Sequence, residues 1–77
     1  MSKLIVMPKL NDAEDPGDIR SVYLSTGDTV ALGDPVVEVE MEKVILDVEA
    51  TESGIVKKVQ VQVGDKVEVG QPLFELE

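Results

Sequence analysis

The sequence has 77 residues, which is enough for one domain but close to the lower limit for folding on a hydrophobic core alone. It contains neither cysteine nor histidine, which excludes a disulfide framework and a thiolate metal site and removes the usual near-neutral general base. Sixteen acidic residues against seven basic ones give a net charge of −9, which argues against nucleic acid and anionic membranes as partners.

No apolar run approaches the length of a membrane span, and the apolar residues 4–7 are too few for the core of a signal peptide. We therefore expect a soluble protein of an intracellular compartment. Residues 1–77 are expected to form a single domain. Its core must be mainly aliphatic, because the chain has no Trp, one Tyr and one Phe.

Short apolar runs that partly alternate with polar residues, separated by Gly and Pro turn signals, predict β-strands along the whole chain. Before the turn signal at residues 51–54 these predicted strands lie at residues 4–7, 17–24, 30–32, 36–40 and 44–50. Residues 9–16 have no hydrophobic period and end in a Pro-Gly pair, which indicates a surface loop. The step from Ile19 to Val22 is three rather than two, which predicts a bulge or bend.

The second half of the chain repeats the first. Residues 27–40 match residues 64–77 at an offset of 64 − 27 = 37, and the match extends back to Gly17 and Gly54. Two copies are too few for a solenoid, but two four-stranded units can bury each other's apolar faces around an approximate twofold axis. The repeat therefore predicts an all-β fold, a flattened barrel or sandwich of two four-stranded antiparallel sheets with pseudo-twofold symmetry.

The inward positions of these strands are mostly paired by the same offset. The predicted core residues are Ile19, Val22, Leu24, Val30, Val39, Leu46, Val48, Val56, Val59, Val61, Val67 and Leu76. The glycines of the chain are interpreted as turn or bend residues that need an unusual φ or close packing.

The segment from Glu40 to Val44 lies between two strongly apolar strands, which predicts a tight hairpin with the amine of Lys43 in water. Under the repeat, Glu40 corresponds to Glu77, so the twofold axis places Lys43 and the chain end at opposite ends of the sandwich. Most surface lysines only increase solubility, and we interpret the remaining lysines in that way. They include Lys3, Lys9, Lys57, Lys58 and Lys66.

The whole chain resembles the biotinyl/lipoyl attachment domains. The resemblance rests on Met7-Pro8, Gly17-Asp18-Ile19, Gly27-Asp28, Gly33-Asp34-Pro35, residues 40–44, Gly54, Gly64-Asp65 and Gly70. In that family one lysine at a hairpin tip carries the cofactor in amide linkage, and this position falls on Lys43. The flanking Glu42 and Val44 resemble lipoyl domains of 2-oxo acid dehydrogenase acyltransferases, although Met41 stands where those domains more often have Thr or Ser.

The resemblance implies a non-catalytic carrier, in which lipoate on Lys43 shuttles acyl groups and reducing equivalents between active sites of a 2-oxo acid dehydrogenase complex. The implied partners are a lipoate-protein ligase or octanoyl/lipoyl transferase, a thiamine-diphosphate 2-oxo acid decarboxylase, an acyltransferase core and dihydrolipoamide dehydrogenase. The implied compartment is a bacterial or archaeal cytoplasm or the mitochondrial matrix. Two alternatives stay open, a biotin carboxyl carrier domain and an unmodified structural adaptor of the same fold.

The two halves differ in one connection. The first half has more residues between Met7 and Gly17 than the second has between Ala50 and Gly54. Pseudo-symmetry, together with the strand pairing of the family, places the extra acidic loop near Lys43. We hypothesise that a decarboxylase recognises this loop, the alternative being a tolerated surface insertion. The candidate recognition residues are Asn11, Asp12, Glu14 and Asp15.

Overall fold

Eight β-strands form the regular secondary structure of the computed structural model, which describes residues 3–10, 16–42 and 44–77. In chain order they are β1 (Lys3–Val6), β2 (Gly17–Val22), β3 (Thr29–Val30), β4 (Pro35–Met41), β5 (Val44–Glu49), β6 (Gly54–Val59), β7 (Lys66–Val67) and β8 (Pro72–Leu76). No helix able to cross a membrane occurs in the part of the chain that is described.

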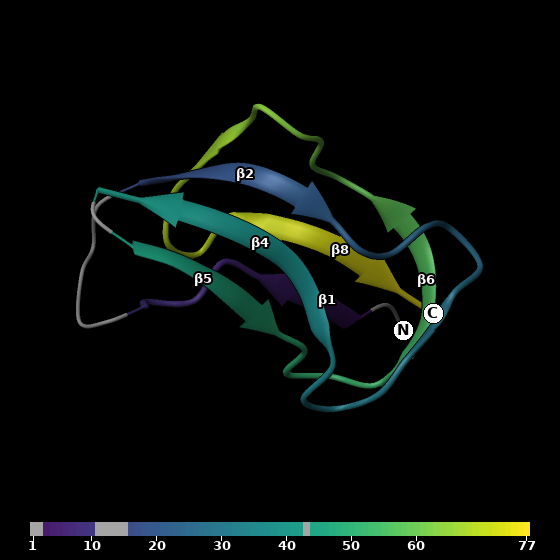
Figure 1. Cartoon of the computed structure of the whole chain (residues 1–77). Helices are drawn as coiled ribbons and strands as arrows, with labels where there is room; N and C mark the ends of the chain where they lie inside the picture. Colours follow the sequence, from purple (N-terminus) through teal and green to yellow (C-terminus); the bar gives the residue numbers. More distant parts are fainter. Residues whose placement is uncertain (1–2, 11–15, 43) are drawn as a thin grey trace.

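The strands form two four-stranded antiparallel sheets with the orders β1-β8-β6-β3 and β5-β4-β2-β7 (Figure 1). The two orders are equivalent under the repeat: β1 corresponds to β5, β2 to β6, β3 to β7 and β4 to β8. This confirms the predicted all-β sandwich and its pseudo-twofold symmetry. In Figure 1 the start of β1 and the end of β8 lie at one end of the molecule, and β4 and β5 come together at the opposite end.

Each sheet contains strands from both halves of the chain. The sequence had instead predicted two separate four-stranded units that pack face to face. Strands β1 and β3 of the first half join β6 and β8, and β5 and β7 join β2 and β4. The exchange gives each half backbone hydrogen bonds to the other, for example from Gly27 N to Val56 O at 2.8 Å. The equivalent bond in the other half runs from Gly64 N to Ile19 O at 2.9 Å. Neither half can therefore complete its sheet alone.

The repeated turns use the same side-chain hydrogen bond in both halves. The Asp28 carboxylate accepts the Ser25 N–H at 2.7 Å, and the Asp65 carboxylate accepts the Gln62 N–H at 3.0 Å. Gly27, just before the aspartate, has φ +96°, a conformation that L residues rarely adopt. The Gly-Asp pairs of the sequence thus mark turns that orient the strands without any ligand.

The core contains sixteen buried apolar side chains among the described residues. Of the twelve predicted core residues, eight are buried; Val22, Leu24, Leu46 and Val59 are partly buried and pack against them. The buried residues missed by the prediction are Ile5, Met7, Val36, Val37, Met41, Ala50, Leu73 and Phe74.

Bulges explain much of this difference. The register shift predicted after Ile19 is present between β2 and β4, and its repeat lies after Val56. Two further shifts skip Val36 in β4 and Leu73 in β8. Each skipped residue and its next neighbour are both fully buried, which strict alternation does not predict.

Candidate functional site

The connection between β4 and β5 is short, with Glu42 in a turn. Met41 and Val44 are opposite each other in the ladder, and the register is unbroken back to Val39 and Leu46. The ladder therefore extends one residue further along β4 than the sequence predicts, so only positions 42 and 43 lie between the two strands. Lys43 itself lies outside the described residues.

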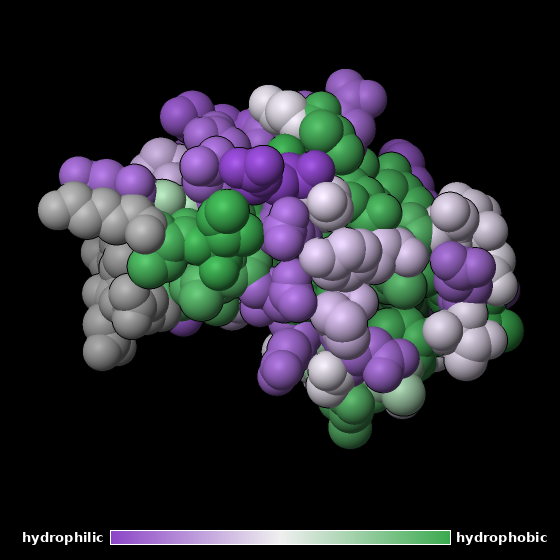
Figure 2. All heavy atoms as spheres, viewed as in Figure 1, coloured by the Kyte–Doolittle hydropathy of each residue, from purple (hydrophilic) through white to green (hydrophobic). Residues whose placement is uncertain are grey.

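The residues around this turn differ in exposure. Met41 is 7% exposed and belongs to the core cluster, whereas Glu42 is exposed. Val44 and Ile45, at the start of β5, are 40% and 49% exposed. Figure 2 shows a hydrophobic area over the start of β5, beside a largely hydrophilic face. Of the predicted flanking residues, Glu42 and Val44 are therefore available to a partner, and Met41 holds the turn on the core.

Gly17 brings the start of β2 against β4. A Cβ atom at this position would lie 2.3 Å from Val39 Cγ1 and 3.5 Å from Met41 Cγ. The close packing that the sequence analysis allowed for the glycines is thus present here, directly behind the turn. It fixes the end of β4 against β2 and so positions the hairpin.

Two ion pairs lie side by side on the outer face of this sheet. In the ladder, Asp18 lies opposite both Glu40 of β4 and Lys66 of β7. Arg20 Nη1 lies 3.5 Å from Glu40 Oε1, and Lys66 Nζ lies 3.6 Å from Asp18 Oδ1. All four side chains are about half-exposed or more, so each pair contributes at most about 1 kcal/mol to stability. The pairs compensate much of the negative charge close to the turn. The sequence analysis did not find them.

An open hollow of about 490 Å³ lies beside the turn. Its lining residues are Pro16, Asp18, Glu40, Met41, Glu42 and Lys66. Pro16, the first described residue after position 15, therefore lies beside the hairpin. The predicted recognition residues Asn11, Asp12, Glu14 and Asp15 lie outside the described residues.

The extra length of the first connection is visible in the hydrogen bonding. Met7 and Ala50 occupy equivalent places, because each exchanges backbone hydrogen bonds with the turn that precedes a central strand. From there to the next strand the first half uses 17 − 7 = 10 steps to Gly17, and the second uses 54 − 50 = 4 steps to Gly54. The fold itself therefore does not require the additional residues.

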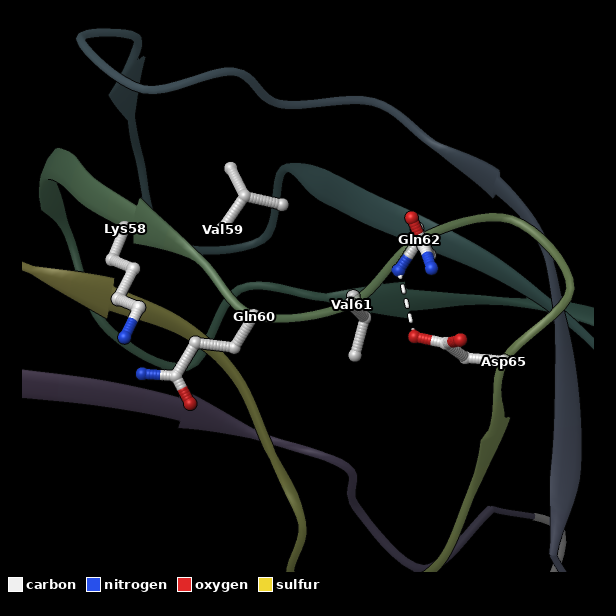
Figure 3. Close-up of a pocket in the computed structure, with 6 residues that line it drawn as sticks. All are labelled: Lys58, Val59, Gln60, Val61, Gln62 and Asp65. Carbon is white, nitrogen blue, oxygen red and sulfur yellow. Dashed lines mark hydrogen bonds between the residues drawn. The ribbon is translucent and has the colours of Figure 1, made fainter.

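A second open hollow, of about 460 Å³, shares no residue with the first (Figure 3). Lys58, Gln60 and Gln62 contribute its polar groups, together with Asp65. The Asp65 carboxylate already accepts the Gln62 N–H, so it serves the turn. The described residues contain no cluster of three acidic side chains able to hold a metal ion.

Tyr23 connects the end of β2 to β5 across the same outer face. Its hydroxyl donates a hydrogen bond to Asp47 Oδ1 at 3.0 Å. Desolvation, the hydrogen bond to Asp47 and the negative charges of Asp47 and Glu38 raise the pKa of Tyr23 above its ordinary value of 10.0. The protonated phenol is therefore the form that folding favours.

The single tyrosine gives a direct test of this contact. Because the pKa of Tyr23 is higher in the folded protein, its contribution to stability is fully present below about pH 10 and is lost as the pH rises through the raised pKa. We expect ultraviolet titration of the native protein to give a pKa above 10, and Asp47→Asn to bring that pKa down toward 10. An unchanged pKa in Asp47→Asn would show that the hydrogen bond is absent in solution.

Comparisons with known proteins agree with this geometry. The profile of a protein family described as "Biotin-requiring enzyme", the biotin/lipoyl family, matches residues 3–76. No curated protein sequence gives a match.

Two solved structures are similar. The urea carboxylase of Kluyveromyces lactis has 30% identity and a TM-score of 0.79; the match covers 100% of this chain and 6% of the carboxylase. The lipoyl domain of the 2-oxoglutarate dehydrogenase complex of Azotobacter vinelandii has 24% identity and a TM-score of 0.67, over 95% of each chain. The first similarity relates this chain to one small part of a long protein, and the second shows the shared fold.

Proposed function

Because the chain belongs to the biotin/lipoyl attachment family, whose domains are non-catalytic carriers of lipoate or biotin bound covalently to a lysine, we propose that it is a lipoyl carrier domain modified on Lys43. The observation that carries the proposal is the composition of the hairpin turn. An acidic residue precedes the lysine, and the β-branched Val44 follows it. Biotin carriers typically place Met on both sides.

The biotin alternative has its own support in the similarity to urea carboxylase. Against it stand both neighbours of the lysine, Glu42 and Val44, which are not methionines. Met41 does not replace a flanking methionine, because it lies two positions before the lysine and faces the core. The third reading, an unmodified adaptor, leaves the exposed apolar side chains of Val44 and Ile45 without a role.

The residues around the turn suit the presentation of a long modified side chain. Bound lipoate would supply a dithiolane that accepts acyl groups and reducing equivalents. Met41 and Gly17 hold the base of the hairpin on the core, which fixes the strand end that leads to the lysine. Exposed Val44 and Ile45 give a modifying enzyme an apolar contact beside the lysine. Tethering then raises the local concentration of the group at each active site it visits.

The proposed partners follow from this role. A lipoate-protein ligase or octanoyl/lipoyl transferase would modify Lys43. A thiamine-diphosphate 2-oxo acid decarboxylase, an acyltransferase core and dihydrolipoamide dehydrogenase would use the modified domain. The domain would accordingly serve a dihydrolipoamide acyltransferase in a bacterial or archaeal cytoplasm or in the mitochondrial matrix.

Modification assays distinguish the lipoyl carrier from the biotin carrier and from the unmodified adaptor. After incubation with a lipoate-protein ligase, lipoate and ATP, we expect one lipoyl group per chain by intact mass, located on Lys43 by peptide mapping. Lys43→Arg should take up none, while Lys57→Arg, on the opposite sheet, should be modified as the native chain is. Biotin on Lys43 after incubation with a biotin ligase, in the absence of lipoylation, would contradict the proposal and support the alternative.

The acidic loop has a separate proposed role, recognition by the decarboxylase. Two observations support this role. Pro16, which follows the loop, lies beside the hairpin, and the equivalent connection in the second half is shorter, so the fold does not require the loop residues. We expect removal of residues 11–15 to leave lipoylation unchanged but to slow reductive acylation about tenfold, which corresponds to about 1.4 kcal/mol of recognition energy. Equal acylation rates for shortened and native domains, both folded and fully lipoylated, would show that the loop is only a surface insertion.

A further inference from the structure

We propose that Lys66 is an internal acyl acceptor, whose amine takes an acyl group from a thioester on the lipoyl group of the same molecule and becomes an Nε-acyllysine. The proposal rests on the lipoyl function proposed above. It assigns a second covalent site to the domain, at a lysine that the sequence alone suggests is only solubilising. Three observations support it: the position of Lys66 in the sheet, the exposure of its amine and the hollow that it shares with the turn.

The first observation is the position of Lys66. It lies in β7 opposite Asp18 of β2, which in turn lies opposite Glu40 of β4. Neighbouring strands are about 4.8 Å apart, so the backbones of Lys66 and Glu40 are separated by about 10 Å. The turn begins only two residues after Glu40. A lysine side chain extended by lipoate is long enough to bend back over this distance.

The second observation is the environment of the amine. The Lys66 side chain is 67% exposed, and its ion pair with Asp18 is 3.6 Å long and itself half-exposed. Pairs of this kind are weak, so the amine leaves the carboxylate readily.

The third observation is the hollow. Lys66 lines it together with Met41 and Glu42, the residues that lead into the turn. Lys66 therefore borders the same open space as the residues that lead to the modified position.

The chemistry is a thioester-to-amide transfer. The neutral amine nitrogen attacks the thioester carbonyl, the carbon–sulfur bond breaks and a carbon–nitrogen amide bond forms. The nitrogen loses a proton to solvent, and the departing thiolate takes one up to become a thiol, so nothing is oxidised or reduced. The product removes the positive charge of Lys66 and leaves Asp18 without its ion-pair partner.

Lys57 is a matched control within the same chain. Its Nζ lies 3.7 Å from Glu75 Oε2, and its side chain is 54% exposed, so the ion-pair distance and the exposure of the lysine are close to those of Lys66, although Glu75 is less exposed than Asp18. It belongs to β6 in the other sheet and does not line the hollow. A difference between the two lysines therefore reports proximity to the turn rather than general reactivity.

The experiment loads the lipoylated and reduced domain with acetyl groups by exchange with a small acetyl thioester, removes the reagent and follows acetyl-lysine by peptide mass spectrometry. An isotopically heavy Lys43→Arg domain is present at the same concentration, about 10 µM, as an acceptor in trans. An effective concentration in the millimolar range predicts that Lys66 of the loaded chain is acetylated about 100-fold faster than Lys66 of the heavy chain. It should exceed Lys57 of the loaded chain by a similar factor.

Two variants sharpen the result. Lys66→Arg should abolish the fast acetylation while the arm loads with thioester as before, and Asp18→Asn should accelerate it about twofold by releasing the amine. Equal rates for Lys66 in the loaded and heavy chains, or for Lys66 and Lys57, would overturn the inference and leave the lipoyl function intact. A chain that takes up no lipoate on Lys43 would overturn the proposed function and this inference with it.

Discussion

Gly17→Ala is expected to lower the free energy of unfolding by about 3 kcal/mol, because the new methyl group would overlap a core side chain. Its Cβ would lie 2.3 Å from Val39 Cγ1, and Val39 is fully buried and β-branched, so it cannot turn away. Relief requires β2 to move off β4 directly behind the hairpin. Denaturant unfolding followed by circular dichroism measures the change.

A second-site substitution tests the cause. Val39→Ala removes the clashing methyl group, so Gly17→Ala should cost much less in that background than in the native one. Gly27→Ala is the comparison for backbone effects. It would meet no atom within 4 Å but forces a residue with a side chain into φ +96°, at a cost of about 1–2 kcal/mol. If Gly17→Ala costs as much with Val39→Ala as without it, the close approach is not the reason for the glycine.

The internal repeat explains why so much of the fold could be predicted. Matching residues at an offset of 37 predicts matching backbone hydrogen bonds. One such pair runs from Tyr23 N to Val36 O at 3.0 Å and from Gln60 N to Leu73 O at 2.9 Å. The three-residue step after Ile19 likewise predicted a bulge that the sheet contains. An internal repeat and the local spacing of apolar residues can both be recognised in the sequence without knowledge of the strand pairing.

The exchange of strands between halves could not be predicted in the same way. A repeat requires that the two sheets be equivalent, but either sheet can be built from one half or from both. That choice depends on long-range pairing, such as β1 with β8, which leaves no local pattern. The bulges at Val36 and Leu73 were hidden for a related reason, since consecutive apolar residues do not reveal which of them is skipped in the ladder.

The ion pairs beside the hairpin could have been suspected from the sequence, because the two copies of the repeat differ in charge there. Under the repeat, Asp18 corresponds to Ile55 and Lys66 to Thr29, so the ion pair of one sheet has no counterpart in the other. A fold maintained by symmetry has no need of such a difference. Positions where two copies diverge in charge are therefore candidates for function, and here they lie next to the turn.

Phe74→Ala is expected to have the largest effect on stability, a loss of about 3–5 kcal/mol. Phe74 is fully buried, is the largest of the fully buried side chains and is the only phenylalanine of the chain. It lies in the ladder between Ile5 of β1 and Val59 of β6. Native domains have only about 5–15 kcal/mol of stability in total, so this loss removes a large share of it.

Thermal and denaturant unfolding of three variants decides whether volume is the cause. Phe74→Leu keeps most of the side chain and should recover more than half of the loss, since a smaller cavity remains. Leu32→Ala is the surface control, because Leu32 is 67% exposed and its truncation should change the free energy of unfolding by less than about 0.5 kcal/mol. A loss below 1 kcal/mol for Phe74→Ala would mean that the sheets close around the missing ring. The partner strands of Phe74 come from both halves, so such closure would require the interlocked sheets to shift together.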